Sequence, residues 1–297
     1  MATMKPSSLP DAYGENWQAY LTRVGLRVLL YAMLIVLCII ALAPFFFMFS
    51  GSLMAPGEIF SLTPHFVPQQ LFWQNYSDLF QRFPFLTYMR NSAVISIANT
   101  LGVLFFSSLI GYVFAKRHFP GRDALFVFVL ITATLPGGVT IIIPWYLMMV
   151  KLGWVNTFLP LIVPWLAPAL NIFLMRQYIR AGVPDELLDA ATIDGCGMFG
   201  LYRRIVLPLV RPGLVVIGIL QFITVWNDFL FSLLILQRDQ VRTATVALTL
   251  LATRNEQATP YGPLFAGIAL ATLPTIVIFF IFQRVLTQGI LSGALRG

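Results

Sequence analysis

The residues with the clearest chemical pattern in this chain lie in one segment, from position 184 to position 208. The segment begins with Pro184, Asp185 and Glu186. A proline followed by carboxylates suits the first turn of a helix, where the helix dipole is positive. Gly195 can adopt the left-handed conformation that closes such a helix, and Pro208 ends the apolar pattern that follows. The sequence therefore predicts two short helices joined by a glycine turn.

The second of these helices has one apolar face, made by residues at spacings of three and four: Met198, Leu201, Tyr202 and Ile205. Two kinds of partner fit such a face. An amphipathic helix can lie on the inner leaflet of a membrane, held there by Arg203 and Arg204. Alternatively, an apolar ridge beside a glycine turn can dock into a groove on another protein. The pattern alone does not choose between these two partners.

A second group combines aromatic and polar side chains inside an apolar stretch, and it consists of Phe222, Trp226, Asn227 and Asp228. Aromatic faces stack on sugar rings, and amide and carboxylate groups bond hydroxyls. The group is therefore a candidate for a translocation path. The alternative is that Asn227 and Asp228 only form hydrogen bonds to a neighbouring helix.

Motifs for energy coupling and catalysis are absent from the sequence. It contains no G-x-x-x-x-G-K-[ST] phosphate loop, so no ATP site is expected in this chain. His65 and His118 are the only histidines and lie far apart, which argues against a metal site or a catalytic triad. We therefore expect no catalytic residue, no metal and no cofactor in this chain. An ion-coupled secondary carrier is the alternative class, but such a carrier needs ionisable relays, and only Asp228 stands out inside an apolar stretch.

The elements that position these residues are predicted to cross a membrane. Hydrophobic residues make up 58% of the chain and charged residues 10%, against about 25% charged residues in soluble domains. A spanning helix needs about 20 mainly apolar residues, and six segments come near that length: 28–49, 92–114, 124–143, 159–174, 214–236 and 264–282. The sequence thus predicts an all-α membrane protein with about six transmembrane helices.

The charges in the loops orient these segments. With the N-terminus inside, 13 of the 19 Lys and Arg residues lie in inner loops and six in outer loops. The positive-inside rule then favours two cytoplasmic termini. The net charge of +7 is accordingly assigned to cytoplasmic loops and not to nucleic-acid binding. The first apolar segment is longer than the core of a signal peptide and is expected to remain as an anchor.

The chain divides into four predicted parts: a cytoplasmic N-terminal segment (1–27), the first transmembrane helix with an outer loop (28–90), a core transmembrane domain containing the 184–208 segment (91–284), and a cytoplasmic tail (285–297). A second outer loop, from 237 to 263, is long and polar.

The 184–208 segment closely resembles the loop through which binding-protein-dependent ABC importers contact their ATPase, usually written E-A-A-x-x-x-G. Here it reads Asp189-Ala190-Ala191-Thr192-Ile193-Asp194-Gly195, and Ile205-x-Leu207-Pro208 follows at the family's spacing. Asp189 replaces the usual Glu, Tyr202 the usual Phe and Cys196 the common Ala. The resemblance implies an ATPase-coupling loop that includes Asp189, Ala190, Ala191, Asp194, Gly195, Met198, Leu201, Tyr202, Ile205 and Pro208.

Three further stretches are similar to the smaller permease of maltose-type systems, in the carbohydrate branch of that family: Phe119-Pro120-Gly121-Arg122, Trp226-Asn227-Asp228-Phe229-Leu230 and the glycine-rich ending 288–297. The resemblance covers residues 25–297. It implies the type I ABC importer permease fold. It also implies alternating-access transport of a sugar, or of a related polyol or sugar derivative, across a bacterial inner membrane.

The same resemblance implies a set of partners: a second permease subunit in a heterodimer, two ATPase subunits that bind ATP and Mg²⁺, an external solute-binding protein, and membrane lipid. In that family the C-terminal tail enters the interface between the ATPases, so Gly289, Gly293 and Arg296 are expected to contact an ATPase. Composition alone would instead favour a solvated chain end. The loop 237–263 is expected to face the binding protein, and the sugar is expected to sit mainly on the partner permease.

Overall fold

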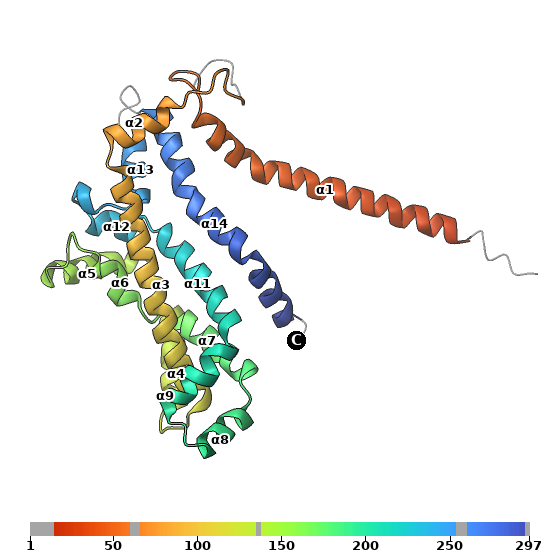
Figure 1. Cartoon of the computed structure of the whole chain (residues 1–297), viewed down its shortest axis with the longest axis vertical. Helices are drawn as coiled ribbons and strands as arrows, with labels where there is room; N and C mark the ends of the chain where they lie inside the picture. The colour runs from red at the N-terminus through yellow and green to blue at the C-terminus, as the bar shows by residue number, and fades with distance from the viewer. Residues whose placement is uncertain (1–14, 60–65, 135–137, 254–259, 295–297) are drawn as a thin grey trace, which may run out of the picture.

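The computed structural model describes residues 15–59, 66–134, 138–253 and 260–294, and within these ranges the chain is helical and has no strand (Figure 1). The α-helices are α1 (Glu15–Gly51), α2 (Gln74–Arg82), α3 (Phe85–Lys116), α4 (Arg122–Thr134), α5 (Gly138–Lys151), α6 (Leu159–Ile162), α7 (Ala169–Gly182), α8 (Asp185–Ile193), α9 (Met198–Leu201), α10 (Leu207–Leu209), α11 (Arg211–Trp226), α12 (Leu230–Ile235), α13 (Ala244–Ala252) and α14 (Tyr261–Ala294). Three short turns of other helix types are η1 (Val163–Trp165), η2 (Tyr202–Val206, a π-helix) and η3 (Asp239–Val241).

Within the described residues, three helices are long and apolar enough to cross a membrane: Tyr20–Gly51 of α1, Phe85–Lys116 of α3 and Tyr261–Gln283 of α14. Two bent pairs raise the number of spans to five if each pair counts as one: Leu159–Trp165 with Ala169–Gly182, at 45°, and Met198–Leu209 with Arg211–Trp226, at 78°. The predicted all-α membrane protein is confirmed, and the third, fourth and fifth of the six candidate segments are each broken into shorter helices.

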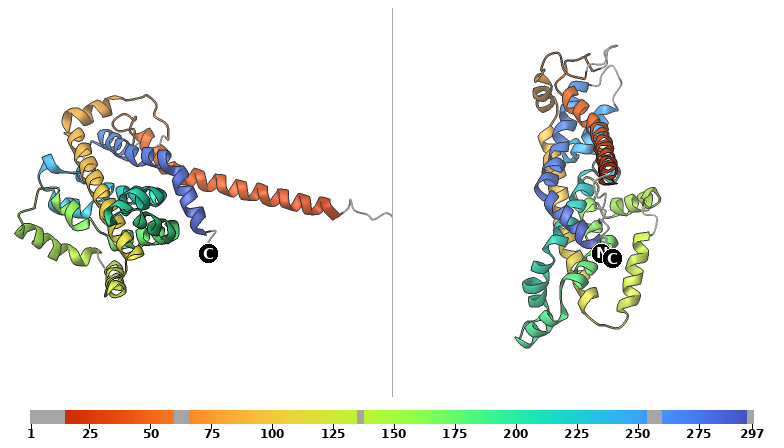
Figure 2. Two further views of the ribbon diagram at one scale, coloured as in Figure 1. Left: turned by 60° about the horizontal axis from the view of Figure 1, so that its bottom comes forward. Right: turned by 90° about the vertical axis from the view of Figure 1, so that its right-hand side faces the viewer.

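Each broken segment carries residues that interrupt a helix. In the segment 124–143, α4 ends at Thr134 and α5 begins at Gly138, and the two helices run in different directions (Figure 2). In the segment 159–174, the chain turns before Pro168, whose ring disfavours helical geometry at the preceding residue. In the segment 214–236, α11 ends at Trp226 because Asp228 caps the next helix by accepting a hydrogen bond from the backbone N–H of Ser232 (2.9 Å).

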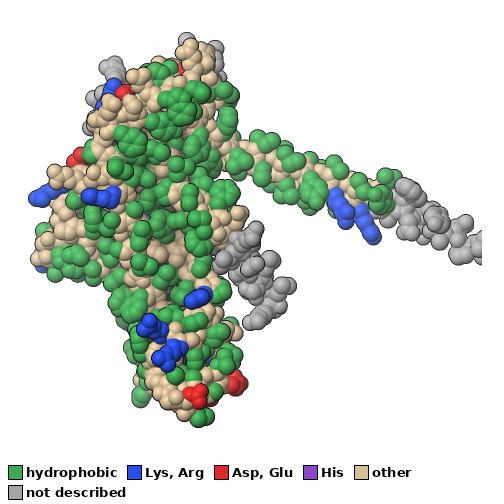
Figure 3. Space-filling view, in the orientation of Figure 1, with side chains coloured by type: hydrophobic (Ala, Val, Ile, Leu, Met, Phe, Trp, Pro, Cys, Tyr) green, Lys and Arg blue, Asp and Glu red, His purple; other side chains and the backbone are tan. Residues whose placement is uncertain are grey.

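Helix α1 projects away from the rest of the chain (Figure 1), and its most apolar stretch is not buried at all. Its C-terminal end is held by an edge-on contact between the rings of Phe47 and Phe265, whose centroids lie 5.8 Å apart. Hydrophobic side chains cover α1 and most of this face of the molecule, as Figure 3 shows. Lipid or another membrane subunit must therefore cover α1 in the assembled protein.

Helix α3 is the centre of the bundle and packs against α7 and α11. Gly111 permits the close approach to α7, because a Cβ at this position would lie only 2.9 Å from the Cβ of Met175 and 3.0 Å from the backbone N of Arg176. Small residues are the usual means by which membrane helices approach each other closely. One cluster of the hydrophobic core surrounds this contact, with Tyr112, Ile179 and Tyr202 fully or almost fully buried.

The predicted loop 237–263 is partly helical. Its first half forms η3 and α13, and α13 buries an apolar face made of Ala244, Val246, Leu248 and Leu251. The expectation of a long polar loop is wrong for this half, since α13 packs against α3 and α14. Arg254 lies outside the described residues.

Candidate functional site

The segment 184–208 forms the end of the molecule farthest from α2 and α13 (Figure 1). Helix α8 ends in a glycine turn, as predicted, because Gly195 has φ +83° and its N–H bonds the carbonyl of Thr192 at 3.0 Å. The next N–H, that of Cys196, bonds the carbonyl of Ala191 at 2.9 Å. Helix α9 then begins at Met198. The predicted pair of helices with a glycine turn between them is confirmed.

The apolar face of the second helix points into the chain's own core. Tyr202 is only 2% exposed, its Oη lies 2.7 Å from the Oγ of Ser108 on α3, and its ring lies 5.8 Å from that of Tyr112. Leu201 is equally buried and Ile205 is half-buried. The idea of an outward ridge on this face is therefore wrong for Leu201 and Tyr202. These two side chains anchor the segment to α3 and α7.

The segment 184–208 forms a tip of the molecule, and another set of its apolar side chains faces outward. Ile193 is 87% exposed and Phe199 is 61% exposed, and Leu187 and Met198 are also exposed. Asp189, Asp194 and Pro208 lie on the exposed surface of the same segment, and acidic side chains mark this tip in Figure 3. The sequence analysis did not select Leu187 and Ile193 on α8 or Phe199 on α9 as site residues, because it considered only the 198/201/202/205 stripe.

Three amides form a chain of hydrogen bonds in the middle of the bundle. The Nδ2 of Asn171 donates to Gln221 (2.9 Å), the Nε2 of Gln221 donates to Asn99 (2.8 Å), and the Nδ2 of Asn99 donates to the carbonyl of Leu161 (3.0 Å). The chain joins α3, α6, α7 and α11. Asn99 is completely buried, so it needs these partners to offset the loss of water.

A cavity of about 250 Å³ lies against this amide chain. Asn99 and Gln221 line it on one side, Trp165 and Phe231 supply aromatic rings, and Asp228 lies at its wall. The carboxylate of Asp228 also accepts the hydroxyl of Ser232 at 2.7 Å. The lining of the cavity is mainly apolar, and the amides of Asn99 and Gln221 and the carboxylate of Asp228 are among its few polar groups.

The structure separates the four residues predicted for a translocation path. Phe222 and Trp226 stack on each other, with ring centroids 5.5 Å apart, along an apolar groove between α3, α11 and α14. The indole of Trp226 donates to the carbonyl of Ala271 (3.0 Å), and the amide of Asn227 bonds its own helix. Of the four, only Asp228 lines the cavity beside Asn99 and Gln221. Asn99 and Gln221 were missed, although an amide inside an apolar segment is a usable signal.

The predicted C-terminal tail is helical where the structure describes it. Helix α14 continues to Ala294, so Gly289 and Gly293 lie on a helix and not in an extended glycine-rich tail. Arg296 lies outside the described residues. Among the described residues no group of three or more His, Cys, Asp or Glu side chains could hold a metal.

Comparisons with known proteins agree with this architecture. Residues 107–292 match the family described as binding-protein-dependent transport system inner membrane component. The arabinooligosaccharides transport system permease protein AraQ of Halalkalibacterium halodurans is 35% identical over 241 residues, which cover 80% of this chain and 84% of the relative. AraQ of Bacillus subtilis is 33% identical, covering 91% and 96% of the two chains.

A second kind of relative and one solved structure are also similar. The melibiose/raffinose/stachyose import permease protein MelC of Bacillus subtilis is 32% identical, covering 86% of this chain and 91% of that protein. A chain in the crystal structure of a bacterial ABC transporter involved in the import of the acidic polysaccharide alginate superposes with a TM-score of 0.80 and 21% identity. That match covers 89% of this chain and 97% of the other, and it shows a shared fold.

Proposed function

We propose a specific transport role for this chain, which belongs to the family of binding-protein-dependent transport system inner membrane components. It is a multi-pass permease subunit of an ABC importer for sugars and not an enzyme. Membership of this family implies a partner permease, ATPases and a solute-binding protein. We infer that the solute is an oligosaccharide or a related sugar derivative, as the names of the relatives suggest.

The complex is proposed to contain this chain, one different permease and two ATPases, with both termini of this chain in the cytoplasm. ATP and Mg²⁺ would be held by the ATPases, because this chain has no phosphate loop. Closure of the ATPase dimer would push on the 184–208 segment and reorient the permease pair, which is alternating access. Arg296, Gly289 and Gly293 stay predicted contacts of the ATPases.

The main support for this proposal is that the tip formed by α8 and α9 has a buried inner side and an exposed apolar outer side. Leu201 and Tyr202 fix its inner side to the bundle, while Ile193 and Phe199 expose large apolar side chains on its outer surface. Exposed apolar groups on a rigid support are typical of a protein docking site. An anchored inner face lets a push on the outer face move the membrane helices behind it.

Replacing Phe199 with Asp is expected to lower the amount of ATPase that copurifies with the permease pair several-fold. A charged carboxylate would have to be desolvated in the contact, and the ring's burial would be lost. The measurement is the ATPase-to-permease ratio after affinity purification from detergent or nanodiscs. Phe66→Asp, at an equally exposed phenylalanine of an outer loop, is the matched control. An unchanged ratio for Phe199→Asp would contradict docking at this tip.

The cavity beside Asn99 and Gln221 is proposed to contact the sugar during passage, through its aromatic rings and its few polar groups. We expect Gln221→Leu to raise the external sugar concentration needed for half-maximal uptake several-fold, because it removes an amide from the cavity and leaves the carbonyl oxygen of Asn99 without its donor. Uptake of labelled arabinooligosaccharides into proteoliposomes would measure this. Gln283→Leu, on the exposed surface of α14, is the control. If both variants show the same concentration dependence as the unaltered protein, the cavity does not contact the sugar.

A further inference from the structure

Lys116, the last residue of α3, is held in an unusual setting for a lysine. Its side chain is only 8% exposed, and its ammonium donates to the carbonyl of Val183 at 2.6 Å and to a carboxylate oxygen of Asp185 at 2.7 Å. A lysine is rarely buried unless its charge is paired and its donors are used. Its burial therefore indicates that these two bonds are a fixed part of the structure.

The two acceptors of Lys116 flank Pro184, the N-cap residue immediately before α8. The bonds therefore join the C-terminal end of α3 to the N-terminal end of α8. The carboxylate of Asp185 is itself exposed, and the adjacent ammonium of Lys116 lowers its pKa through a hydrogen bond and charge attraction. Asp185 is thus ionised at neutral pH and keeps its attraction for Lys116. Beyond this link, α8 is held inward by the buried side chain of Leu188.

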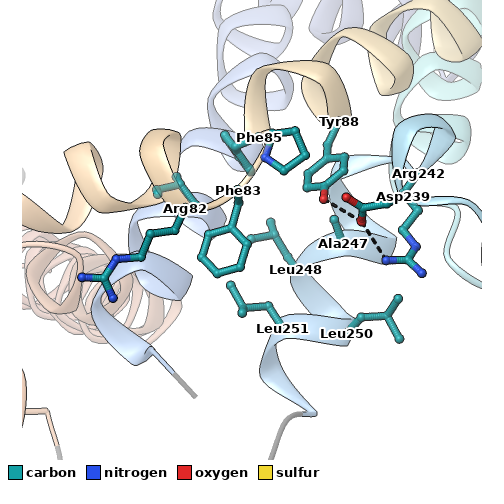
Figure 4. Close-up of a pocket in the computed structure, with 12 residues that line it drawn as sticks. Arg82, Phe83, Phe85, Tyr88, Asp239, Arg242, Ala247, Leu248, Leu250 and Leu251 are labelled. Carbon is teal, nitrogen blue, oxygen red and sulfur yellow. Dashed lines mark hydrogen bonds and ion pairs between the residues drawn. The ribbon is translucent and has the colours of Figure 1, made fainter. Parts of the chain in front are cut away.

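The opposite end of α3 is bonded to the outer segment 239–244. The hydroxyl of Tyr88 donates to Asp239 (2.8 Å), and Asp239 also pairs with Arg242 (2.8 Å), as Figure 4 shows. The amide of Asn91 donates to the carbonyls of residues 240 and 242, both at 3.0 Å. The hydroxyl of Ser92 accepts the N–H of Ala244 at 2.9 Å. These hydrogen bonds therefore fix this end of α3 to the start of α13.

Helix α3 between these ends is continuous. It has 32 residues and no internal proline, which gives it a length of about 48 Å. Halfway along, Asn99 is part of the amide chain beside the cavity, and nearer Lys116 the hydroxyl of Ser108 forms a hydrogen bond with Tyr202. One rigid helix therefore touches the tip, the cavity and the outer segment 239–244.

We propose that Lys116 is a positioning residue that makes α8 move together with α3, so that displacement of the tip by an ATPase reaches the cavity and the outer segment 239–244. The proposal rests on the proposed function, because it requires an ATPase to act on the tip. The bonds to Val183 and Asp185 prevent α8 from pivoting about Pro184. Without them the tip could bind the ATPase and still fail to transmit its motion.

The test is Lys116→Met in the complete complex, coexpressed with its partner subunits and placed in nanodiscs. Methionine keeps most of the apolar stem but has no ammonium. We expect the ATPase to copurify at its normal ratio and the basal ATPase rate to stay within about twofold. We expect stimulation of that rate by the solute-binding protein, loaded from a mixture of arabinooligosaccharides, to fall at least about fivefold.

Two further variants separate a positioning role from a general loss of structure. Lys116→Arg should restore most of the stimulation, because a guanidinium can also bond a carbonyl and a carboxylate. Arg180→Met removes a cation from the exposed surface of the neighbouring α7 and should leave stimulation unchanged. Normal stimulation in Lys116→Met would overturn the proposal, as would loss of ATPase association, since that result would assign Lys116 to assembly.

The outcome for Lys116 can be told apart from the outcome for the proposed function. Phe199→Asp, measured in the same preparations, tests docking of the ATPase on the tip. If Phe199→Asp loses the ATPase while Lys116→Met is fully stimulated, the coupling function stands and the role of Lys116 is wrong. If Phe199→Asp has no effect, the docking site itself is wrong, and the proposal for Lys116 fails with it.

Discussion

Gly111→Leu is expected to prevent most of the protein from accumulating as a folded membrane protein. The Cβ alone would lie 2.9 Å from the Cβ of Met175 and 3.0 Å from the backbone N of Arg176. Backbone cannot rotate away as a side chain can, so α3 and α7 would have to separate along their main contact. Overpacking of this kind costs about 1–3 kcal/mol and more where the backbone must shift.

The measurement is the yield of monodisperse protein from solubilised membranes together with its apparent melting temperature. We expect a melting temperature lower by about 5–10 °C for the protein that is recovered. Gly25→Leu is the control, because Gly25 lies inside α1 where no other side chain of this chain comes within 4 Å. A normal yield and melting temperature for Gly111→Leu would mean that α3 and α7 are not in close contact.

Gly195→Val is expected to abolish transport while leaving the protein in the membrane. No atom lies within 4 Å of a Cβ at this position, so the substitution creates no clash. The backbone has φ +83°, however, and a β-branched residue is strongly disfavoured there. The turn would open to relieve the strain, and α8 and α9 would no longer present Ile193 and Phe199 on one surface. We expect at least about a tenfold loss of ATP-driven uptake.

Gly197→Val provides a closely matched control for this variant. Gly197 lies two residues further along, also has open space around its Cβ, and has φ −70°. It should therefore accept valine with a small effect on uptake. Gly195→Asp should have an intermediate effect, because aspartate tolerates left-handed geometry better than valine does. Equal uptake by the Gly195 and Gly197 valine variants would show that the left-handed turn is not needed for coupling.

The class of protein, the importer family and the form of the coupling segment could all be predicted from the sequence. These features depend on local order along the chain. Apolar length indicates a membrane helix in any fold, and an acidic helix start followed by a capping glycine predicts a helical turn wherever it occurs. The motif Asp189–Gly195 carried the family resemblance, which the comparisons then confirmed. The same family match excludes the ion-coupled carrier, which the composition had left as an alternative.

Which side chains face the core and which remain exposed could be read only from the packing of the helices. A spacing of three and four identifies the apolar face of a helix but does not say whether that face packs on the protein's own core, on lipid or on a partner. Tyr202 was therefore expected to face a partner, whereas its hydroxyl forms a hydrogen bond with Ser108 on α3. Likewise, Trp226 and Asp228 are two positions apart in sequence. Because α11 ends at Trp226, their side chains line different cavities. The bond between Lys116 and Val183 joins residues 67 positions apart. Such contacts depend on how separate helices pack, and no local pattern in the chain specifies that packing.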